Sequence, residues 1–153
     1  MKTLLIEDDY YFGEEIVGDL ENAIPSLKGS FDIIRTEQQF KERFQGSEPL
    51  QFGFIILDVM LTWDNQSGGR PPAEVVKGGY FEAGIRCLKQ LREHPSTRST
   101  PVIVHSARDT DQILQNILKE RISMDGVTVV PKSGDPEPLV SAVRQLQTSP
   151  DVS

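Results

Sequence analysis

Four apolar stretches of the sequence each end on polar side chains that can do chemistry. Glu7 and Asp8 follow the run LLI, and Asp58 follows FIIL. Ser106 follows VIVH, and Lys132 follows TVVP. If these stretches are strands of one parallel sheet, their carboxyl ends meet at the edge where such sheets bind ligands. The sequence therefore predicts that three carboxylates, one hydroxyl and one ammonium group lie at the same edge.

Three neighbouring carboxylates require compensation for their charge. Two unit charges about 4 Å apart repel by roughly 4 kcal/mol at an effective dielectric constant near 20. A bound cation or raised pKa values must therefore accompany the cluster. All the candidate ligands are oxygen atoms, with no Cys or His in the pattern, so the cluster favours Mg²⁺, or a similar ion such as Mn²⁺, over zinc.

Asp58 is the candidate nucleophile of this cluster. A hard metal ion with few protein ligands keeps positions open for water or a phosphoryl oxygen. Asp58 can then attack a phosphoryl donor and form an acyl phosphate, while the metal and Lys132 stabilise the transferring oxygens and Ser106 hydrogen-bonds the bound group. The alternative interpretation is structural: the three acids are helix caps or solvated loop residues, and the lysine is an ordinary surface residue.

The rest of the sequence predicts the elements that would position these side chains. Strand patterns cover residues 2–6, 31–35, 53–58, 101–106 and 126–132. Apolar residues at helical spacing lie between them, in 12–24, 36–44, 81–91, 109–122 and 137–147. Five alternating strand–helix units predict an α/β protein: a flavodoxin-like three-layer sandwich around a five-stranded parallel sheet of order 2-1-3-4-5.

Capping and loop residues add detail to this prediction. Asp9 is expected to cap the first helix, and Thr36 to open the second in a capping box with Gln39. We interpret the Gly- and Pro-rich stretch at 62–79, TWDNQSGGRPPAEVVKGG, as a long loop. The chain is then a single domain over residues 1–148 with a polar tail at 149–153.

Composition narrows the classes of function. The 153 residues carry a net charge of −7, which argues against binding nucleic acid through a basic face. Cys87 is the only cysteine, so an internal disulfide is impossible and a reducing compartment is expected. No apolar run is long enough for a membrane span, and no signal peptide is evident. We therefore expect a cytoplasmic protein that binds neither nucleic acid nor membrane.

The motifs LLIEDD, FIILDVML, PVIVHSA and VVPK, taken in this order, carry a family resemblance. The chain resembles the receiver domain of two-component response regulators over essentially its whole length, apart from the long loop. The resemblance implies that Asp58 is the phosphoacceptor and that Glu7 and Asp8 are the acidic pair that holds Mg²⁺. It also implies a further metal ligand, the backbone carbonyl of Met60.

The resemblance assigns the remaining polar residues too. Ser106 would be the switch hydroxyl, and Lys132 would contact the phosphoryl group. Met60 and Arg108 occupy the two positions that tune the rate of dephosphorylation. Because neither is a carboxylate or an amide that can orient a water molecule, we expect a long-lived acyl phosphate.

Three residues depart from the family pattern. Thr62 stands where the family usually has proline, and Ser133 replaces the proline that usually follows the conserved lysine. Val129 lies near the position of the aromatic residue that swings inward on activation. Val129 cannot swing inward as an aromatic residue does, whereas the residues for metal and phosphate chemistry are present.

We therefore expect a stand-alone phosphoacceptor switch rather than an enzyme acting on other substrates. A histidine kinase or histidine phosphotransfer protein would phosphorylate it. The output would pass through the surface of the fourth helix, fifth strand and fifth helix to a downstream protein or a second copy of the chain. The first alternative is a pseudo-receiver that serves as a scaffold without phosphorylation. The second is a phosphohydrolase with an aspartate nucleophile, which the order of the acidic motifs disfavours.

Overall fold

Strands and helices alternate along the chain in the structure, a computed structural model that describes residues 1–46, 50–63, 73, 79 and 82–148. The strands are β1 (Lys2–Ile6), β2 (Phe31–Ile34), β3 (Phe52–Leu57), β4 (Val102–Ser106) and β5 (Val127–Pro131). The helices that the structure describes are α1 (Tyr10–Ala23), α2 (Glu37–Gln45), α4 (Ala83–Glu93), α5 (Thr110–Lys119) and α6 (Glu137–Thr148), with a 3₁₀ turn at Pro25–Leu27.

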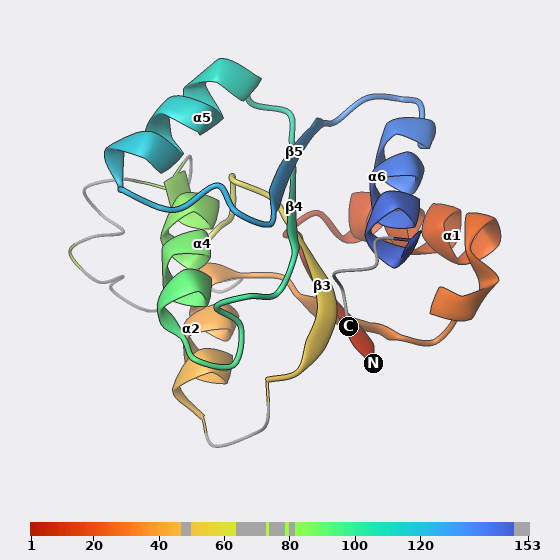
Figure 1. The fold of residues 1–153 in the computed structure, drawn as a ribbon, viewed down its shortest axis with the longest axis horizontal. Coiled ribbons are helices and arrows are strands. Elements are labelled where there is room, and N and C mark those ends of the chain that lie inside the picture. Colours follow the sequence, from red (N-terminus) through yellow and green to blue (C-terminus); the bar gives the residue numbers. More distant parts are fainter. Residues whose placement is uncertain (47–49, 64–72, 74–78, 80–81, 149–153) are drawn as a thin grey trace.

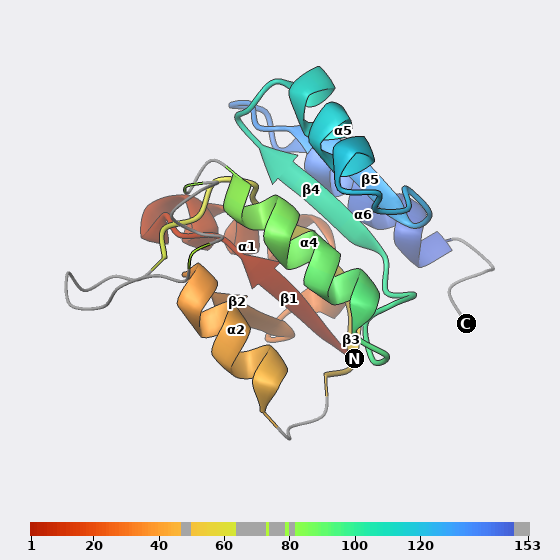
Figure 2. The ribbon, with the colours of Figure 1, turned by 90° about the vertical axis from the view of Figure 1, so that its left-hand side faces the viewer.

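The five strands form one parallel sheet of order β2-β1-β3-β4-β5, so the predicted topology is confirmed. Helices α1 and α6 cover one face of the sheet, and α2, α4 and α5 cover the other (Figure 1). Figure 2 shows this second set of helices in front of the strands. The chain is therefore a three-layer sandwich.

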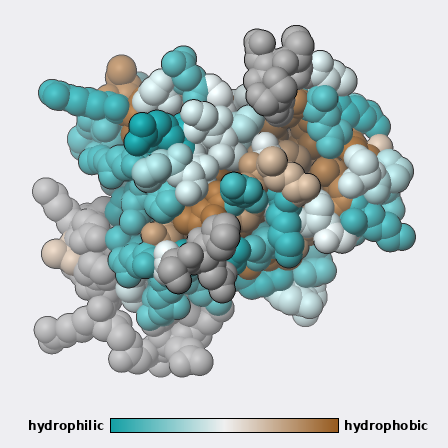
Figure 3. Space-filling view, turned by 60° about the horizontal axis from the view of Figure 1, so that its bottom comes forward, coloured by the Kyte–Doolittle hydropathy of each residue, from teal (hydrophilic) through white to brown (hydrophobic). Residues whose placement is uncertain are grey.

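Both faces of the sheet are buried, which explains the nearly continuous apolar runs of the strands. In β1, Leu4 and Ile6 pack in the apolar cluster under α2, α4 and α5, whereas Leu5 packs in the cluster under α1 and α6. The visible surface in Figure 3 is mainly hydrophilic, with apolar residues showing between polar ones. No helix in the described part of the chain is long and apolar enough to cross a membrane.

Helix ends follow the predicted capping chemistry with two differences. Asp9 accepts a hydrogen bond from the Phe12 N–H at 2.9 Å, and Thr36 Oγ1 accepts one from the Gln39 N–H at 3.1 Å. The Gln39 side chain, however, accepts from the Arg35 N–H at 2.8 Å, so the expected return bond of a capping box goes to the preceding residue. Helix α5 also ends at Lys119, before the predicted 122, because the chain turns through a left-handed residue just beyond it.

Helix α4 is held at its carboxyl end by one side chain. The two terminal nitrogens of Arg92 donate to four backbone carbonyl oxygens, two from the segment before β4 and two from the turn before β5. These acceptors are Thr97, Thr100, Asp125 and Gly126. A single guanidinium therefore fixes the helix to the amino ends of two strands.

Most of the long loop predicted at 62–79, and the whole tail at 149–153, lie outside the described residues. The structure does describe the start of that loop, Thr62 and Trp63, and the residue at its end, Gly79.

Candidate functional site

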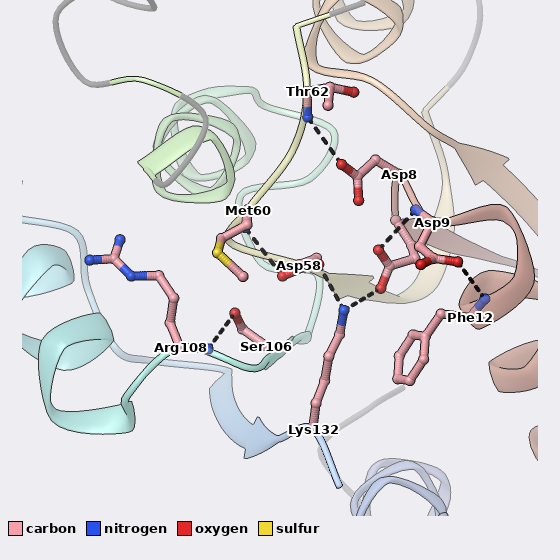
Figure 4. Close-up of polar contacts among 10 residues, drawn as sticks. Asp8, Asp9, Phe12, Asp58, Met60, Thr62, Ser106, Arg108 and Lys132 are labelled. Atoms are coloured by element: carbon pink, nitrogen blue, oxygen red, sulfur yellow. Dashed lines mark hydrogen bonds and ion pairs between the residues drawn. The ribbon is translucent and has the colours of Figure 1, made fainter. Parts of the chain in front are cut away.

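The five polar residues singled out from the sequence lie at the carboxyl edge of the sheet. Glu7 and Asp8 follow β1, Asp58 follows β3, Ser106 is the last residue of β4, and Lys132 follows β5. Figure 4 shows that the side chains of Asp8, Asp58, Ser106 and Lys132 gather in one region above these strand ends. The topology thus brings together residues that are more than a hundred positions apart in the sequence.

Glu7, Asp8 and Asp58 form a compact acidic cluster. Each offers a carboxylate oxygen, and these oxygens all lie within 4.8 Å of one another. Glu7 and Asp58 are buried, with 1% and 4% of their surfaces exposed, whereas Asp8 is half-buried. Three hard oxygen donors at this spacing, open to solvent on the side of Asp8, fit a divalent cation of the Mg²⁺ type.

Lys132 supplies the positive charge of the cluster. Its ammonium group donates to Glu7 Oε1 at 2.7 Å and to Asp58 Oδ2 at 2.9 Å, and it lies 4.3 Å from the centre of the Phe12 ring. Burial lowers the pKa of Lys132, but the charge and hydrogen bonds of Asp58 and Glu7 outweigh burial and raise that pKa. The lysine therefore stays protonated and bridges two of the three acids.

Glu7 has the raised pKa that is expected when carboxylates lie close together. Burial, followed by the negative charge of Asp58, raises the pKa of Glu7 from 4.5 to about 7, against the opposing effect of Lys132. One carboxylate of the cluster therefore titrates near neutral pH.

The backbone around Asp58 is fixed on both sides. Its N–H donates to the Ile6 carbonyl at 3.0 Å, and its Oδ1 accepts from the Met60 N–H at 3.2 Å.

The amino end of α4 packs directly on this segment, and the Gly84 N–H donates to the Val59 carbonyl at 2.7 Å. A Cβ atom at Gly84 would overlap the carbonyl oxygen of Asp58, so only glycine permits this approach. The role of Gly84 was not predicted from the sequence, although a glycine within a helical pattern often marks close packing.

Ser106, Met60 and Arg108, the other residues predicted for the site, differ in how they lie relative to Asp58. Ser106 is buried, and its Oγ accepts from the Arg108 N–H at 3.2 Å. Met60 lies beside Asp58, whereas the Arg108 guanidinium points away from it (Figure 4). That guanidinium donates to Gln112 at 3.5 Å. The assignments of Ser106 as a switch and of Met60 and Arg108 as rate-tuning residues stay predictions.

Two further contacts at the site were not foreseen from the sequence. The Thr62 N–H donates to Asp8 Oδ2 at 3.3 Å, across a separation of 54 residues (Figure 4). His105 is buried and stacks on Phe12, with 5.8 Å between the ring centres. Burial, aided by the charge of Lys132, lowers the pKa of His105 to about 4, so this residue is neutral at physiological pH.

Comparison with known proteins identifies the fold. No protein-family model matches the sequence, and a search of curated proteins gives no significant match. Solved structures of receiver domains do match. A signal receiver domain of a DNA binding response regulator from Colwellia psychrerythraea 34H has a TM-score of 0.66 and 19% identity, over 97% of this chain and 99% of that one.

Two further structures agree with this result. A signal receiver domain from Clostridium thermocellum has a TM-score of 0.64 and 22% identity, over 97% of this chain and 98% of its own. A response regulator receiver domain from Rhodospirillum rubrum has a TM-score of 0.63 and 20% identity, with coverages of 95% and 90%. The chain therefore has the flavodoxin-like fold of response regulator receiver domains.

Proposed function

We propose that this chain is a response regulator receiver that accepts a phosphoryl group on Asp58 in a Mg²⁺-dependent reaction. The observation that carries the proposal is the site itself: Lys132 joins Glu7 to Asp58 while Asp8 completes a three-acid cluster, at the edge of a receiver-type sheet. A purely structural role for these residues would not require two carboxylates to be buried beside a third.

Each residue has a definite part in the proposed reaction. Asp58 attacks phosphorus with one carboxylate oxygen, and the bond from phosphorus to the donor's histidine nitrogen breaks, so that an acyl phosphate forms and the histidine is released. Glu7, Asp8, Asp58 and the Met60 carbonyl would hold Mg²⁺, which supplies charge stabilisation to the phosphoryl oxygens. The Lys132 ammonium stays protonated, and the N–H that donates to the Asp58 carboxylate would donate to a phosphoryl oxygen instead.

Ser106 is the residue that would report the reaction. Its hydroxyl donates to the bound phosphoryl group, which draws the loop after β4 toward Asp58. This movement shifts the population of conformations of α5, β5 and α6, and a downstream protein or a second copy of the chain binds that surface. The phosphoryl donor is a histidine kinase or a histidine phosphotransfer protein, and the setting is the cytoplasm. In this proposal the chain performs no chemistry beyond gaining and losing its own phosphoryl group.

Phosphorylation with a small donor tests the proposal. The protein is incubated with acetyl phosphate, with Mg²⁺ or with a chelator, and its intact mass is measured. We expect a gain of one phosphoryl group that needs Mg²⁺ and is lost in Asp58→Asn but kept in Asp9→Asn, a matched change at the exposed helix cap. No gain in the wild type, or an equal gain in Asp58→Asn, would contradict the proposal.

One observation favours a second function, that of a scaffold that is not phosphorylated. Val129, near the position of the usual aromatic switch, is partly buried against the apolar cluster under α2, α4 and α5. A scaffold would bind its partner with the same affinity whether residue 58 is Asp or Asn. A partner that distinguishes the phosphorylated wild type from Asp58→Asn would exclude this alternative.

A further inference from the structure

Thr62 links the acidic site to a neighbouring part of the chain. Its N–H donates to Asp8 Oδ2, and Asp8 is the most exposed acid of the cluster. Proline, the residue usual at this place in the receivers that the chain resembles, has no N–H to donate. This hydrogen bond therefore requires a residue other than proline at position 62.

The same short segment caps helix α2. The carbonyl oxygens of Thr62 and Trp63 accept hydrogen bonds from the Glu37 and Gln38 N–H groups, both at 2.9 Å. These are the first two N–H groups of the helix, which have no partner within the helix itself. The chain leaving β3 thus bonds to the acidic site through one amide and to the amino end of α2 through two carbonyls.

The first turn of α2 is also tied to α4. Glu37 is 1% exposed, and Arg86 binds its carboxylate through two hydrogen bonds of 2.7 and 2.8 Å. The same guanidinium donates to the Gly79 carbonyl at 2.8 Å. Because a bidentate pair of this kind is rigid, Arg86 fixes the Glu37 side chain, whereas the N–H groups of this turn are held by the Thr62 and Trp63 carbonyls.

We propose that the Thr62 N–H couples occupancy of the acidic site to the order of the first turn of α2. This inference rests on the proposed function, and it adds a second path for the signal beside the surface of α5, β5 and α6. Asp8 accepts the Thr62 N–H through Oδ2, so its other carboxylate oxygen is left to face the cluster. A divalent cation bound by Glu7, Asp8 and Asp58 would offset the repulsion among the three carboxylates and hold the half-buried Asp8 in one position. With Asp8 fixed in this way, the Thr62–Trp63 segment and its two bonds to α2 would open less often.

Amide hydrogen exchange measured by NMR tests the coupling directly. The amides of Glu37 and Gln38 are followed in the metal-free protein, with Mg²⁺, and with Mg²⁺ and beryllofluoride. We expect exchange at both amides to slow by about threefold to tenfold, the effect of roughly one additional hydrogen bond. The His94 amide at the far end of α4 is the reference and should not change. Unchanged or faster exchange at Glu37 and Gln38 would overturn the inference.

A pair of variants separates the backbone donor from the side chain. Thr62→Ala keeps the N–H and should retain the effect of Mg²⁺ on α2, whereas Thr62→Pro removes the N–H and should abolish it. An equal effect of Mg²⁺ in both variants would refute the role of this hydrogen bond. If Thr62→Pro does not fold, exchange of the Thr62 amide itself is followed in the wild type, and no slowing of that exchange with Mg²⁺ would refute the role of this hydrogen bond.

Calorimetric titration with Mg²⁺ distinguishes the two proposals. If Mg²⁺ binds to the wild type and exchange in α2 does not respond, only the coupling is wrong. If Mg²⁺ does not bind at all, the proposed function fails and the coupling fails with it.

Discussion

The buried carboxylate of Glu7 makes the stability of the metal-free protein depend on pH. Its pKa is raised from 4.5 to about 7, chiefly by burial and next by the charge of Asp58. Between these two pH values the folded chain binds more protons than the unfolded chain. The free energy of unfolding must therefore fall as the pH rises through this range. At about 1.4 kcal/mol for each pH unit, the contribution of Glu7 falls by about 2 to 3 kcal/mol from about pH 5 to about pH 8.

Urea denaturation of the wild type and of Glu7→Gln, both in chelator, measures this contribution. Gln resembles the neutral acid in shape but does not titrate. We expect the stability of the wild type relative to Glu7→Gln to decline by the stated amount with rising pH. Added Mg²⁺ should restore most of the loss in the wild type at the upper pH, because the cation stabilises the ionised carboxylate.

A control variant and a clear negative result complete this test. Asp9→Asn removes a neighbouring but exposed acid, so it should shift stability by a similar amount at every pH. If the stability difference between the wild type and Glu7→Gln does not change with pH, the reasoning about the buried cluster is wrong.

Three further predictions follow from contacts around the site and the sheet. Gly84→Ala should destabilise the fold by about 1–3 kcal/mol in urea denaturation and slow phosphorylation, because the added Cβ displaces the Asp58 backbone. Arg92→Met should cost about 2–4 kcal/mol by the same measurement, since four carbonyls lose the guanidinium and only those of Thr97 and Gly126 also accept from a nearby backbone N–H. The acyl phosphate should persist for minutes or longer, because Met60 and Arg108 cannot orient an attacking water; mass spectrometry at timed intervals would show otherwise if it decays within seconds.

The first two of these predictions have matched controls. Gly18→Ala lies in α1, where a Cβ meets no atom within 4 Å, so this substitution should stabilise the helix by up to about 1 kcal/mol. Arg98→Met replaces an exposed arginine and should change stability by less than about 0.5 kcal/mol. If each control costs as much as its test variant, the proposed contacts are not the cause.

The fold could be predicted from the sequence because its strands are short apolar runs between amphipathic helices. A run such as FIIL requires cover on both faces, and that requirement, with right-handed crossovers, leaves few topologies. The positions of Glu7, Asp8, Asp58 and Lys132 followed from the same rule, since parallel strands deliver their carboxyl ends to one edge.

Contacts between distant segments could not be predicted from the sequence in this way. The hydrogen bond from Thr62 to Asp8 uses a backbone N–H, which leaves no trace in residue type. The pairing of Glu37 with Arg86 depends on how two helices pack, and either residue alone looks like an ordinary helical surface charge. Gly84 can be seen as a glycine in the sequence, but only the packed structure shows that its neighbour is the backbone of Asp58.

Helix α4 is fastened at both of its ends, with Gly84 bonded to the backbone beside Asp58 and Arg92 bonded to the turns at the opposite edge of the sheet. Helix α4 can neither slide along the sheet nor tilt without breaking the hydrogen bonds at one of its ends. We therefore expect α4 to move less than α5 and α6 when Asp58 changes, so a distance probe attached to the exposed side of α4 would be a suitable reference point.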